Sequence, residues 1–255
     1  MKRESFSETD QISQAESKPA VDIVVRVVRT EDQLNQARLI RELSYYRTAP
    51  NYAPVVARPD PMDYDPHAII FLAESRSTGL PLASVRVESG RAEQFYPVDH
   101  YPIPKRLDRK FCAYVSRLAA QPGRQGRQAK DYLIKTINLY CMAMQYKWLL
   151  LIAVPPRDRH YKVFGFSPLP ELSELQPLPD TETKKGRIMV CDLMDAEREC
   201  RESNHPYYEF VYQTHSPEIE IFSSVKGAWL TPRAEGSKPP TVVSNLEELN
   251  LPPLV

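Results

Sequence analysis

A short basic segment with two glycines separates an apolar run from an amphipathic one. The apolar run is 111–120, the segment is QPGRQGR at 121–127, and helical spacing continues to about Tyr146. The first backbone N–H groups of a helix lack partners and lie at the positive end of its dipole, so a phosphate group binds there readily. Basic residues oppose that dipole, and an anionic ligand would explain their presence. We therefore predict a phosphate site formed by Gly123, Arg124, Gln125, Gly126 and Arg127, with Lys130 nearby. The alternative is a solvated first turn.

A tyrosine that could donate a proton follows the longest apolar run. Residues 147–154 (KWLLLIAV) predict a strand that is buried on both faces. Tyr161 comes next, in the sequence YKVFGF at 161–166, where a short helix is expected to end. A phenol is a neutral hydrogen-bond donor at pH 7, which suits a general acid. The alternative is an aromatic ring packed at the end of a helix.

Three carboxylates stand where one of them could act as a base. Asp63 and Asp65 lie in a proline-rich loop, and Glu88 ends a predicted strand. A carboxylate within hydrogen-bond reach of an amine can take its proton during attack. The sequence leaves the choice among the three open.

Three arginines lie on the elements that flank these carboxylates. Arg41 is late in the first predicted helix, and Arg86 and Arg117 are in predicted strands. A guanidinium binds a carboxylate through two parallel hydrogen bonds, so Arg86 or Arg117 could hold a carboxylate of the ligand. The alternative is that these arginines form structural ion pairs with Asp63 and Asp65.

The spacing of apolar residues predicts the elements that position these side chains. A capping box at Thr30–Gln33 begins a helix to about Arg47, and a turn at 77–79 joins two strands of a hairpin. Strands are expected at 21–29, 68–74, 81–88, 111–120, 147–154 and 187–193. A helix between the fourth and fifth strands implies a parallel crossover, and the earlier meander implies antiparallel pairing. The order predicts an α/β fold with a mixed sheet, of the α+β kind.

This order and three of the segments resemble the GNAT acyltransferases. The turn at 121–127 resembles their pyrophosphate-binding loop, although Gly123 and Gln128 replace two of its usual residues. The segment at 161–166 is similar to their Tyr-x-x-x-Gly-Phe motif. Val115-Ser-Arg-Leu-Ala119 resembles a strand of the acyl-homoserine-lactone synthases and N-acyl amino acid synthases, in which Tyr114 stands where that family has Glu. Arg41, Arg86 and the two loop aspartates also match these relatives in order.

The resemblance implies an N-acyltransferase that moves an acyl group, expected to be long, from acyl carrier protein or coenzyme A to an amine such as an amino acid. The acyl thioester would be a co-substrate, with no tightly bound cofactor and no metal. It would lie where the fourth and fifth strands part, with Tyr161 as acid and Asp63, Asp65 or Glu88 as base. The resemblance implies donor binding by Leu118, Ala119, Gln121 and the turn at 123–127. It implies acceptor binding by Arg41, Arg86, Tyr114, Ser116 and Arg117.

The composition limits the other functions. Lysine plus arginine equal aspartate plus glutamate at 33 each, which argues against a dedicated nucleic-acid binder. The four cysteines lack metal-ligand spacing and fit a reducing cytoplasm, and no apolar run is long enough to span a membrane. We expect a disordered leader at 1–20, the acyltransferase domain at 21–195, an extension packed on it at 196–230 and a proline-rich tail at 231–255.

Three alternatives remain at this point. The first is a GNAT enzyme that uses acetyl-CoA, and the second is a GNAT-fold binding module without activity, which the Tyr114 position leaves open. The third is a nucleic-acid binder that uses Arg124, Arg127 and Lys130; it is the weakest, because aromatic residues do not alternate with these charges.

Overall fold

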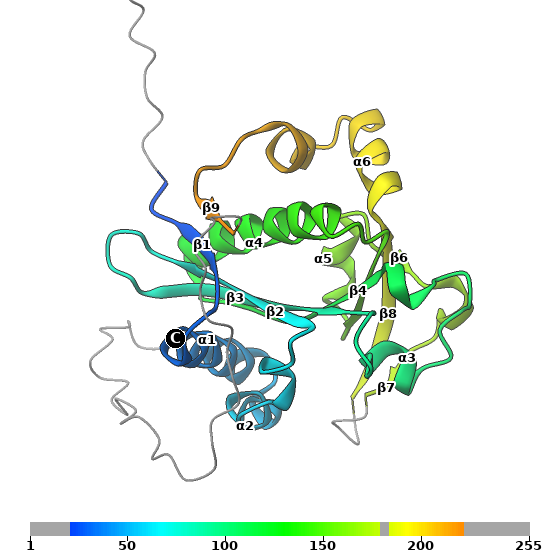
Figure 1. Ribbon diagram of the computed structural model, residues 1–255, viewed down its shortest axis with the longest axis horizontal. Coiled ribbons are helices and arrows are strands. Elements are labelled where there is room, and N and C mark those ends of the chain that lie inside the picture. The colour runs from blue at the N-terminus through cyan, green and yellow to red at the C-terminus, as the bar shows by residue number, and fades with distance from the viewer. Residues whose placement is uncertain (1–20, 179–183, 222–255) are drawn as a thin grey trace, which may run out of the picture.

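The computed structural model describes residues 21–178 and 184–221, whose main strands form a mixed sheet (Figure 1). The order is β6-β8-β5-β4-β3-β2-β1-β9, and β7 pairs with β8 beside this path. The strands are β1 (Val24–Val27), β2 (Ala68–Glu74), β3 (Pro81–Ser89), β4 (Cys112–Ala120), β5 (Trp148–Ala153), β6 (Ser167–Pro168), β7 (Gln176–Pro177), β8 (Lys185–Asp192) and β9 (Ile219–Glu220). The predictions for residues 1–20 and for the chain after residue 221 lie outside the described residues.

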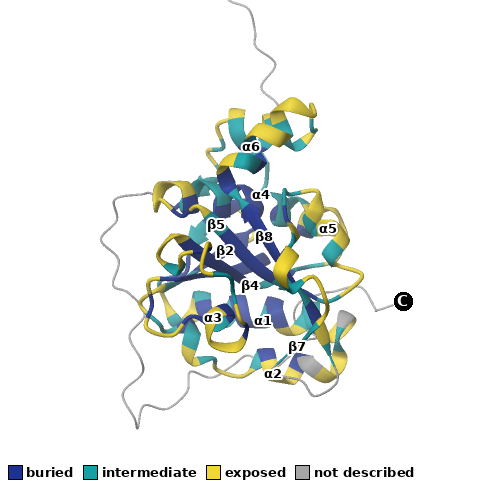
Figure 2. Cartoon of the chain, turned by 90° about the vertical axis from the view of Figure 1, so that its right-hand side faces the viewer, coloured by how far each residue is buried: buried dark blue, intermediate teal, exposed yellow. Residues whose placement is uncertain are grey.

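Helices cover both faces of this sheet, and buried residues concentrate between the layers (Figure 2). One face carries α1 (Glu31–Thr48), α2 (Ala53–Ala57) and α3 (Tyr96–His100); the other carries α4 (Gly123–Ala143), α5 (Asp158–Lys162) and α6 (Leu193–Glu202). The predicted capping box is confirmed, because Thr30 accepts from the backbone N–H of Gln33 and the Gln33 side chain accepts in return. None of the helices in the described ranges combines the length and the apolar character needed to span a bilayer.

The alternation of β3 separates an apolar face from a polar one. Val85 and Val87 join the main core beneath α4, as do Leu133 and Ile137 of that helix. The residues that alternate with these two valines along β3 are Ser84, Arg86 and Glu88, and they point to the opposite face. There the Ser84 hydroxyl donates to the backbone oxygen of Ala37 in α1. On that face one apolar cluster lies under α1 and another under α3. The polar side chains of β3 are therefore held between two apolar clusters.

The parallel strands β4 and β5 pair over only part of their length. The register runs from Cys112 opposite Trp148 to Tyr114 opposite Leu150, after which β4 continues to Ala120 beside β3 and β5 continues beside β8. Backbone groups on the facing edges beyond this point need partners other than each other. The mixed sheet with an antiparallel meander and a parallel β4–α4–β5 crossover confirms the predicted fold class, and the opening between the strands is where the site was expected.

Two segments were given no detailed conformation by the sequence. The basic segment at 121–127 is mostly helical, because α4 begins at Gly123, directly after Gln121 and Pro122. The predicted extension at 196–230 contains the π-helical turn η5 (Glu209–Gln213), which packs against α4. Lys135 of α4 donates to the backbone oxygens of Phe210, at 2.6 Å, and Thr214. The extension after β8 is therefore fastened to α4, and β9 adds to the edge of the sheet.

Candidate active site

A cavity of about 510 Å³ lies where β4 and β5 part. Side chains from β3, β4 and α5 line it, together with the loop before β2 and the segment that contains α3; they include Asp60, Glu88, Tyr96, Ser116, Arg117 and Tyr161. Ligand pockets in proteins commonly measure about 300–1,000 Å³, so this volume suits a small molecule or part of a larger one. The cavity brings carboxylates, arginines and a phenol from distant parts of the sequence to one place.

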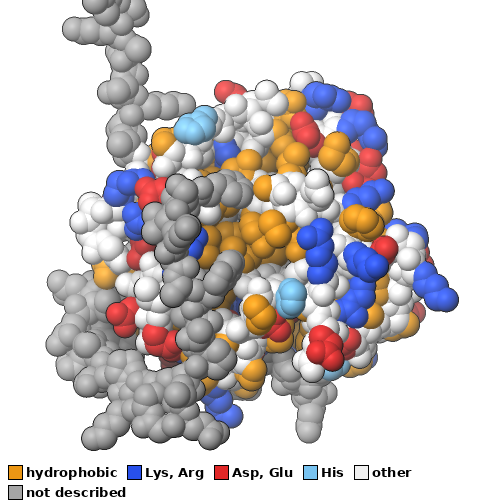
Figure 3. Space-filling view, in the orientation of Figure 1, with side chains coloured by type: hydrophobic (Ala, Val, Ile, Leu, Met, Phe, Trp, Pro, Cys, Tyr) orange, Lys and Arg blue, Asp and Glu red, His pale blue; other side chains and the backbone are white. Residues whose placement is uncertain are grey.

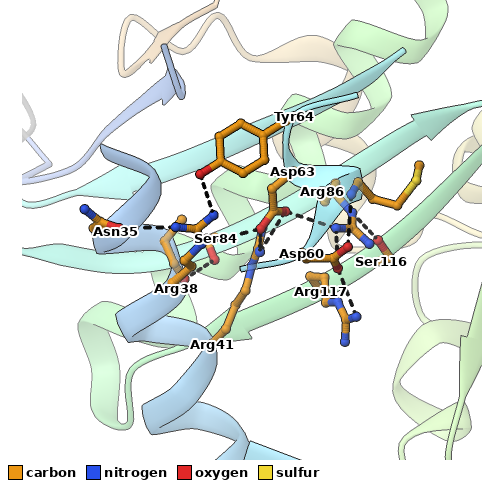
Figure 4. A network of polar contacts seen from close by, with 12 residues as sticks. Asn35, Arg38, Arg41, Asp60, Asp63, Tyr64, Ser84, Arg86, Ser116 and Arg117 are labelled. Atoms are coloured by element: carbon orange, nitrogen blue, oxygen red, sulfur yellow. Dashed lines mark hydrogen bonds and ion pairs between the residues drawn. The ribbon is translucent and has the colours of Figure 1, made fainter. Parts of the chain in front are cut away.

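Beside the cavity, the buried carboxylate of Asp63 joins three arginines (Figure 4). Arg41 Nη1 donates to the two oxygens of Asp63 at 2.9 and 2.7 Å, and Arg86 Nη1 donates at 3.0 Å. Arg38 Nε lies 3.8 Å from the same carboxylate. The side chains of Asp63 and Arg41 are 0% and 1% exposed, so neither is within reach of a ligand in the cavity. The structure thus places this pair in an ion pair rather than at a reacting centre.

This ion pair is costly to bury. Arg41 Nε and Nη2 and Arg38 Nε are buried without a hydrogen-bond partner among the described residues. Burial lowers the pKa of Arg41, and attraction to Asp63 opposes that effect. A buried charge without compensation is strongly unfavourable, so the charge on Arg41 depends on Asp63.

Arg86 links the buried pair to the cavity (Figure 4). Its Nη1 donates to Asp60 Oδ2 at 2.7 Å as well as to Asp63, and its Nε donates to Glu88 Oε1 at 3.0 Å and to Ser116 Oγ at 3.2 Å. Burial disfavours the charged guanidinium, but the three carboxylates outweigh it and raise the pKa of Arg86. Arg86 therefore stays charged and is already occupied by protein groups.

A bulge in β4 turns Arg117 toward the cavity. Ser84 pairs with Ala119 and Arg86 with Ser116, so β4 has one more residue than β3 over this interval. Arg117 adopts φ 55°, a left-handed conformation that is unusual for a residue with a side chain. Its Nη2 lies 3.1 Å from Asp60 Oδ2. Such backbone strain of about 1–3 kcal/mol persists where the surroundings impose it, often at functional sites.

Among the described residues, the carboxylates that line the cavity are those of Asp60, Glu88 and Asp99. Burial of Asp60 by itself would favour the neutral acid. Attraction and a hydrogen bond from Arg86, with attraction from Arg117, outweigh that effect and lower the pKa of Asp60 to about 2. Glu88 is 3% exposed and shares Arg86 with Ser116, whose hydroxyl donates to Glu88 Oε1 at 2.7 Å. Asp60 is consequently a poor base. The other two lining carboxylates are Glu88 and Asp99, and Asp99 accepts from the backbone N–H of Phe95 at 2.7 Å.

Tyr161 reaches the cavity from the other side of the opening. It lies in α5, directly after β5, and its ring makes an edge contact with Phe166 at 6.0 Å between centroids. Burial, and to a lesser extent the nearby Tyr45, raise the pKa of Tyr161 to about 12. The phenol is therefore protonated throughout the neutral range and can donate its proton.

No protein-family model matches the sequence, and no curated protein matches it. Among solved structures, FeeM, an N-acyl amino acid synthase from uncultured soil microbes, has a TM-score of 0.55 at 14% identity, over 74% of this chain and 99% of FeeM. BjaI, a CoA-dependent acyl-homoserine lactone synthase solved with SAM and isopentyl-CoA, has a TM-score of 0.53 at 13% identity, over 83% of this chain and 95% of BjaI. The chain has the GNAT fold. These likenesses concern the arrangement of the backbone.

The residues expected to bind a donor lie at the end of β4 and in the first turn of α4, and only Leu118 among them lines the cavity. Leu118 lines the cavity, Ala119 is buried, and the Gln121 side chain donates to the backbone oxygen of Pro81 at 2.7 Å. The turn at 123–127 is the first turn of α4 and does not line the cavity. A Cβ on Gly126 would lie 2.0 Å from the backbone oxygen of Gln121, so the glycine lets the helix start close to the end of β4.

Basic side chains surround the carboxyl ends of β4 and β5. Both strands run in the same direction, so α4 and α5 start at one edge of the sheet. We call the six residues there the basic rim: Arg124, Arg127, Lys130, Arg157, Arg159 and Lys162. Figure 3 shows lysine and arginine side chains gathered around the position of α5. Arg157 lines the cavity itself, which places the rim next to its opening.

Several lining residues were missed by the sequence analysis, and one prediction falls elsewhere. Tyr96, from the segment between β3 and β4, stacks on Tyr114 with ring centroids 5.5 Å apart. No periodic pattern marks that segment. Asp60 lies in the same loop as Asp63 and Asp65 but outside the motif that those two resemble. Asp65 accepts from the backbone N–H of His67 at 2.7 Å and does not line the cavity. The proton acceptor is therefore better sought among the lining carboxylates.

Proposed function

We propose that this protein is an N-acyltransferase that moves an acyl group from a thioester to the amine of a small acceptor. The observation that supports this most is the position of Glu88 and Tyr161, which line one cavity at the divergence of β4 and β5. Aminolysis of a thioester needs a group that takes a proton from the amine and a group that gives one to the departing sulfur. The cavity supplies one candidate for each role.

Glu88 is the general base in this proposal. Asp63 is enclosed by arginines, Asp65 lies outside the cavity, and the pKa of Asp60 is about 2. The remaining lining carboxylate, Asp99, is held by the backbone N–H of Phe95 at 2.7 Å, whereas Glu88 accepts from a side chain of the cavity wall, Ser116. Glu88 also lies directly opposite Tyr114 in the register of β3 and β4. A carboxylate on β3 thus stands next to the position where the resembling synthases have Glu on β4. The missing glutamate at 114 is accordingly no obstacle to catalysis.

The edges of β4 and β5 would hold the thioester. Beyond Tyr114 and Leu150 these edges no longer pair with each other, so their backbone N–H groups can polarise the thioester carbonyl and bind the chain that precedes it. Tyr161 then protonates the leaving sulfur. Arg117, aimed into the cavity by the bulge, is our candidate for an acceptor carboxylate, because Arg86 is already bonded to four protein groups. An amino acid is the acceptor class that fits, because it has an amine for Glu88 to deprotonate and a carboxylate for Arg117 to bind.

The donor in this proposal is a long-chain acyl group on an acyl carrier protein. The volume of about 510 Å³ leaves room for a chain beside a small acceptor. The first turn of α4 does not enclose the cavity, which disfavours tight binding of a nucleotide pyrophosphate there. The basic rim instead offers an exposed charged surface to an acidic protein. Coenzyme A thioesters are the alternative donor.

Tyr161→Phe is expected to lower kcat about 10- to 100-fold and to leave the donor's KM within about twofold. The reduction is at or below the usual contribution of general acid catalysis, because a thiolate leaves readily even without protonation. Steady-state kinetics with acyl-carrier-protein and acyl-CoA donors and a pool of amino acids, with product identified by mass spectrometry, measures it. Tyr208→Phe, which changes a tyrosine directly before η5 and outside the cavity, is the matched control. An unchanged kcat in Tyr161→Phe would show that another group protonates the sulfur.

Charge reversal on the rim separates the two donors. Arg124→Glu combined with Arg127→Glu is expected to raise KM for acyl carrier protein at least about 10-fold at low salt, and less at 0.5 M salt, because the attraction is screened. KM for the matching acyl-CoA changes much less. Arg106→Glu combined with Arg76→Glu changes the net charge by the same amount at two exposed ion pairs outside the rim, and it serves as the control for net charge. Equal effects on both donors would contradict a carrier-protein surface.

A further inference from the structure

The hydroxyl of Ser116 is hydrogen-bonded to the carboxylate of Glu88 at the wall of the cavity. Both residues line the cavity, but Ser116 is partly exposed whereas Glu88 is only 3% exposed. Their oxygens are 2.7 Å apart, and Arg86 Nε lies 3.2 Å from the serine oxygen and 3.0 Å from the carboxylate. All three side chains come from the adjacent strands β3 and β4, which hold them rigidly (Figure 4 shows Arg86 and Ser116).

Hydrogen-bond accounting settles the direction of the proton. The single Nε–H of Arg86 is shared between Glu88 Oε1 and Ser116 Oγ. Because a guanidinium can only donate, this contact uses a lone pair of the serine oxygen. The single hydroxyl hydrogen of Ser116 must then point to Glu88, which accepts it as a carboxylate. A hydroxyl has two acceptor positions, and among the described residues the structure gives it only the Arg86 donor. One acceptor position is therefore available to an N–H group in the cavity that Ser116 lines.

We propose that Ser116 relays the proton of the acceptor amine to Glu88. The idea rests on the proposed acyl transfer. As the amine nitrogen forms its bond to the thioester carbonyl carbon, its proton passes to Ser116 Oγ and the hydroxyl proton passes to Glu88 Oε1. The serine is unchanged and Glu88 becomes a neutral acid. When the carbon–sulfur bond breaks, the sulfur takes a proton from Tyr161. Before the next cycle, Glu88 gives its extra proton to solvent and Tyr161 takes one from solvent.

Arg86 positions this relay and cannot replace it. Its pKa is raised, so it holds its proton throughout. It donates to both the serine oxygen and the carboxylate, and so aligns the serine hydroxyl toward Glu88. Glu88 lines the cavity but is only 3% exposed, and the relay offers the amine a hydroxyl that is more exposed than this carboxylate. Ser116 in this view is catalytic through its hydroxyl and makes no covalent bond to the acyl group.

Ser116→Ala and Ser116→Thr test the relay in the full-length protein with the donor that the wild type uses. We expect Ser116→Ala to lower kcat about 30-fold, less than loss of the base, because a water molecule can occupy part of the vacated space. KM for both substrates stays within about twofold. Threonine retains the hydroxyl and restores kcat to within about threefold of wild type. Ser84→Ala, on the same face of β3 but bonded to Ala37, is the matched control and keeps its kcat.

A second readout is the rate constant of the chemical step, measured in single-turnover reactions at increasing fractions of D₂O. Two transferred protons give a curved dependence in wild type, and Ser116→Ala alters that curvature. An alanine variant with unchanged kcat, an effect on KM alone, or a threonine variant as slow as alanine would each overturn the relay. Each of these comparisons needs an active wild-type protein, and product from the wild type supports acyl transfer whether or not the relay exists. If the wild type forms no product with acyl carrier protein, long-chain acyl-CoA or acetyl-CoA donors, the proposed function fails and the relay with it.

Discussion

Glu88→Gln lowers kcat for acyl transfer by about 1,000-fold, within the usual range for loss of a general base. Glutamine has the same shape and its oxygen can still accept from Arg86 and Ser116, so the architecture of the site is retained. An amide cannot take a proton from the amine at neutral pH. Arg86 keeps Asp60 and Asp63 as ionic partners, which limits the loss of stability. Single-turnover kinetics at saturating donor and acceptor measure the effect without a contribution from product release.

The matched control for this prediction is Asp65→Asn. Like Glu88→Gln, it replaces a carboxylate by its amide. Asp65, however, lies outside the cavity and only accepts from the backbone N–H of His67. Its kcat should remain within about twofold of wild type. If Glu88→Gln is equally active, the base is another group, and Asp60→Asn becomes the variant to measure next. Equal losses in Glu88→Gln and Asp65→Asn would indicate a general effect on folding instead.

Asp63→Asn is expected to lower the free energy of unfolding by about 3–5 kcal/mol. The change leaves Arg41 buried with its charge uncompensated, and removal of one partner from a buried ion pair typically costs that amount. Arg38 and Arg86 also lose a nearby negative charge. Urea unfolding at pH 7, followed by circular dichroism and extrapolated linearly to water, gives the value.

An exposed ion pair provides the comparison. Glu171 accepts from Arg106 at 2.7 and 2.9 Å, a geometry as good as that at Asp63, yet both side chains are more than 40% exposed. Glu171→Gln should cost less than about 1 kcal/mol, because water already solvates both charges. A loss of stability below about 1 kcal/mol for Asp63→Asn would mean that water or a shift of Arg41 compensates the charge.

The periodic parts of the fold were predictable from the sequence. Burial of one or both faces leaves a simple pattern of apolar residues that predicts strands. This pattern is clear in the β-branched run before Thr30, in the hairpin around the turn at 77–79 and in the apolar run at 147–154. The parallel crossover followed from the helix between β4 and β5. Tyr161 was a candidate because its segment resembles a GNAT motif, and Glu88 was one of three bases open to the mechanism that this resemblance implies; both line the cavity.

The contacts within the site were not predictable in the same way. The partners of Asp60, Asp63 and Arg41 depend on distances across three elements that no local pattern specifies. The bulge at Arg117 leaves no mark in the sequence, since arginine has no preference for a left-handed conformation. The segment between β3 and β4 supplies Tyr96 to the cavity and has neither helical nor strand periodicity. Sequence patterns report burial, and these features arise from close packing of polar groups.

The pairing of β9 with β1 has a consequence for biosynthesis. The backbone N–H of Val25 donates to the oxygen of Glu218 at 2.8 Å, and Arg26 bonds to Glu220, 194 positions later in the chain. While the nascent chain emerges from the ribosome, the outer edge of β1 stays without its partner until nearly all of the described residues have been made. An uncovered strand edge can pair with a second nascent chain. Ribosomes that translate this message in close succession would therefore favour misassembly at β1, and a chaperone that binds the early chain would counter it.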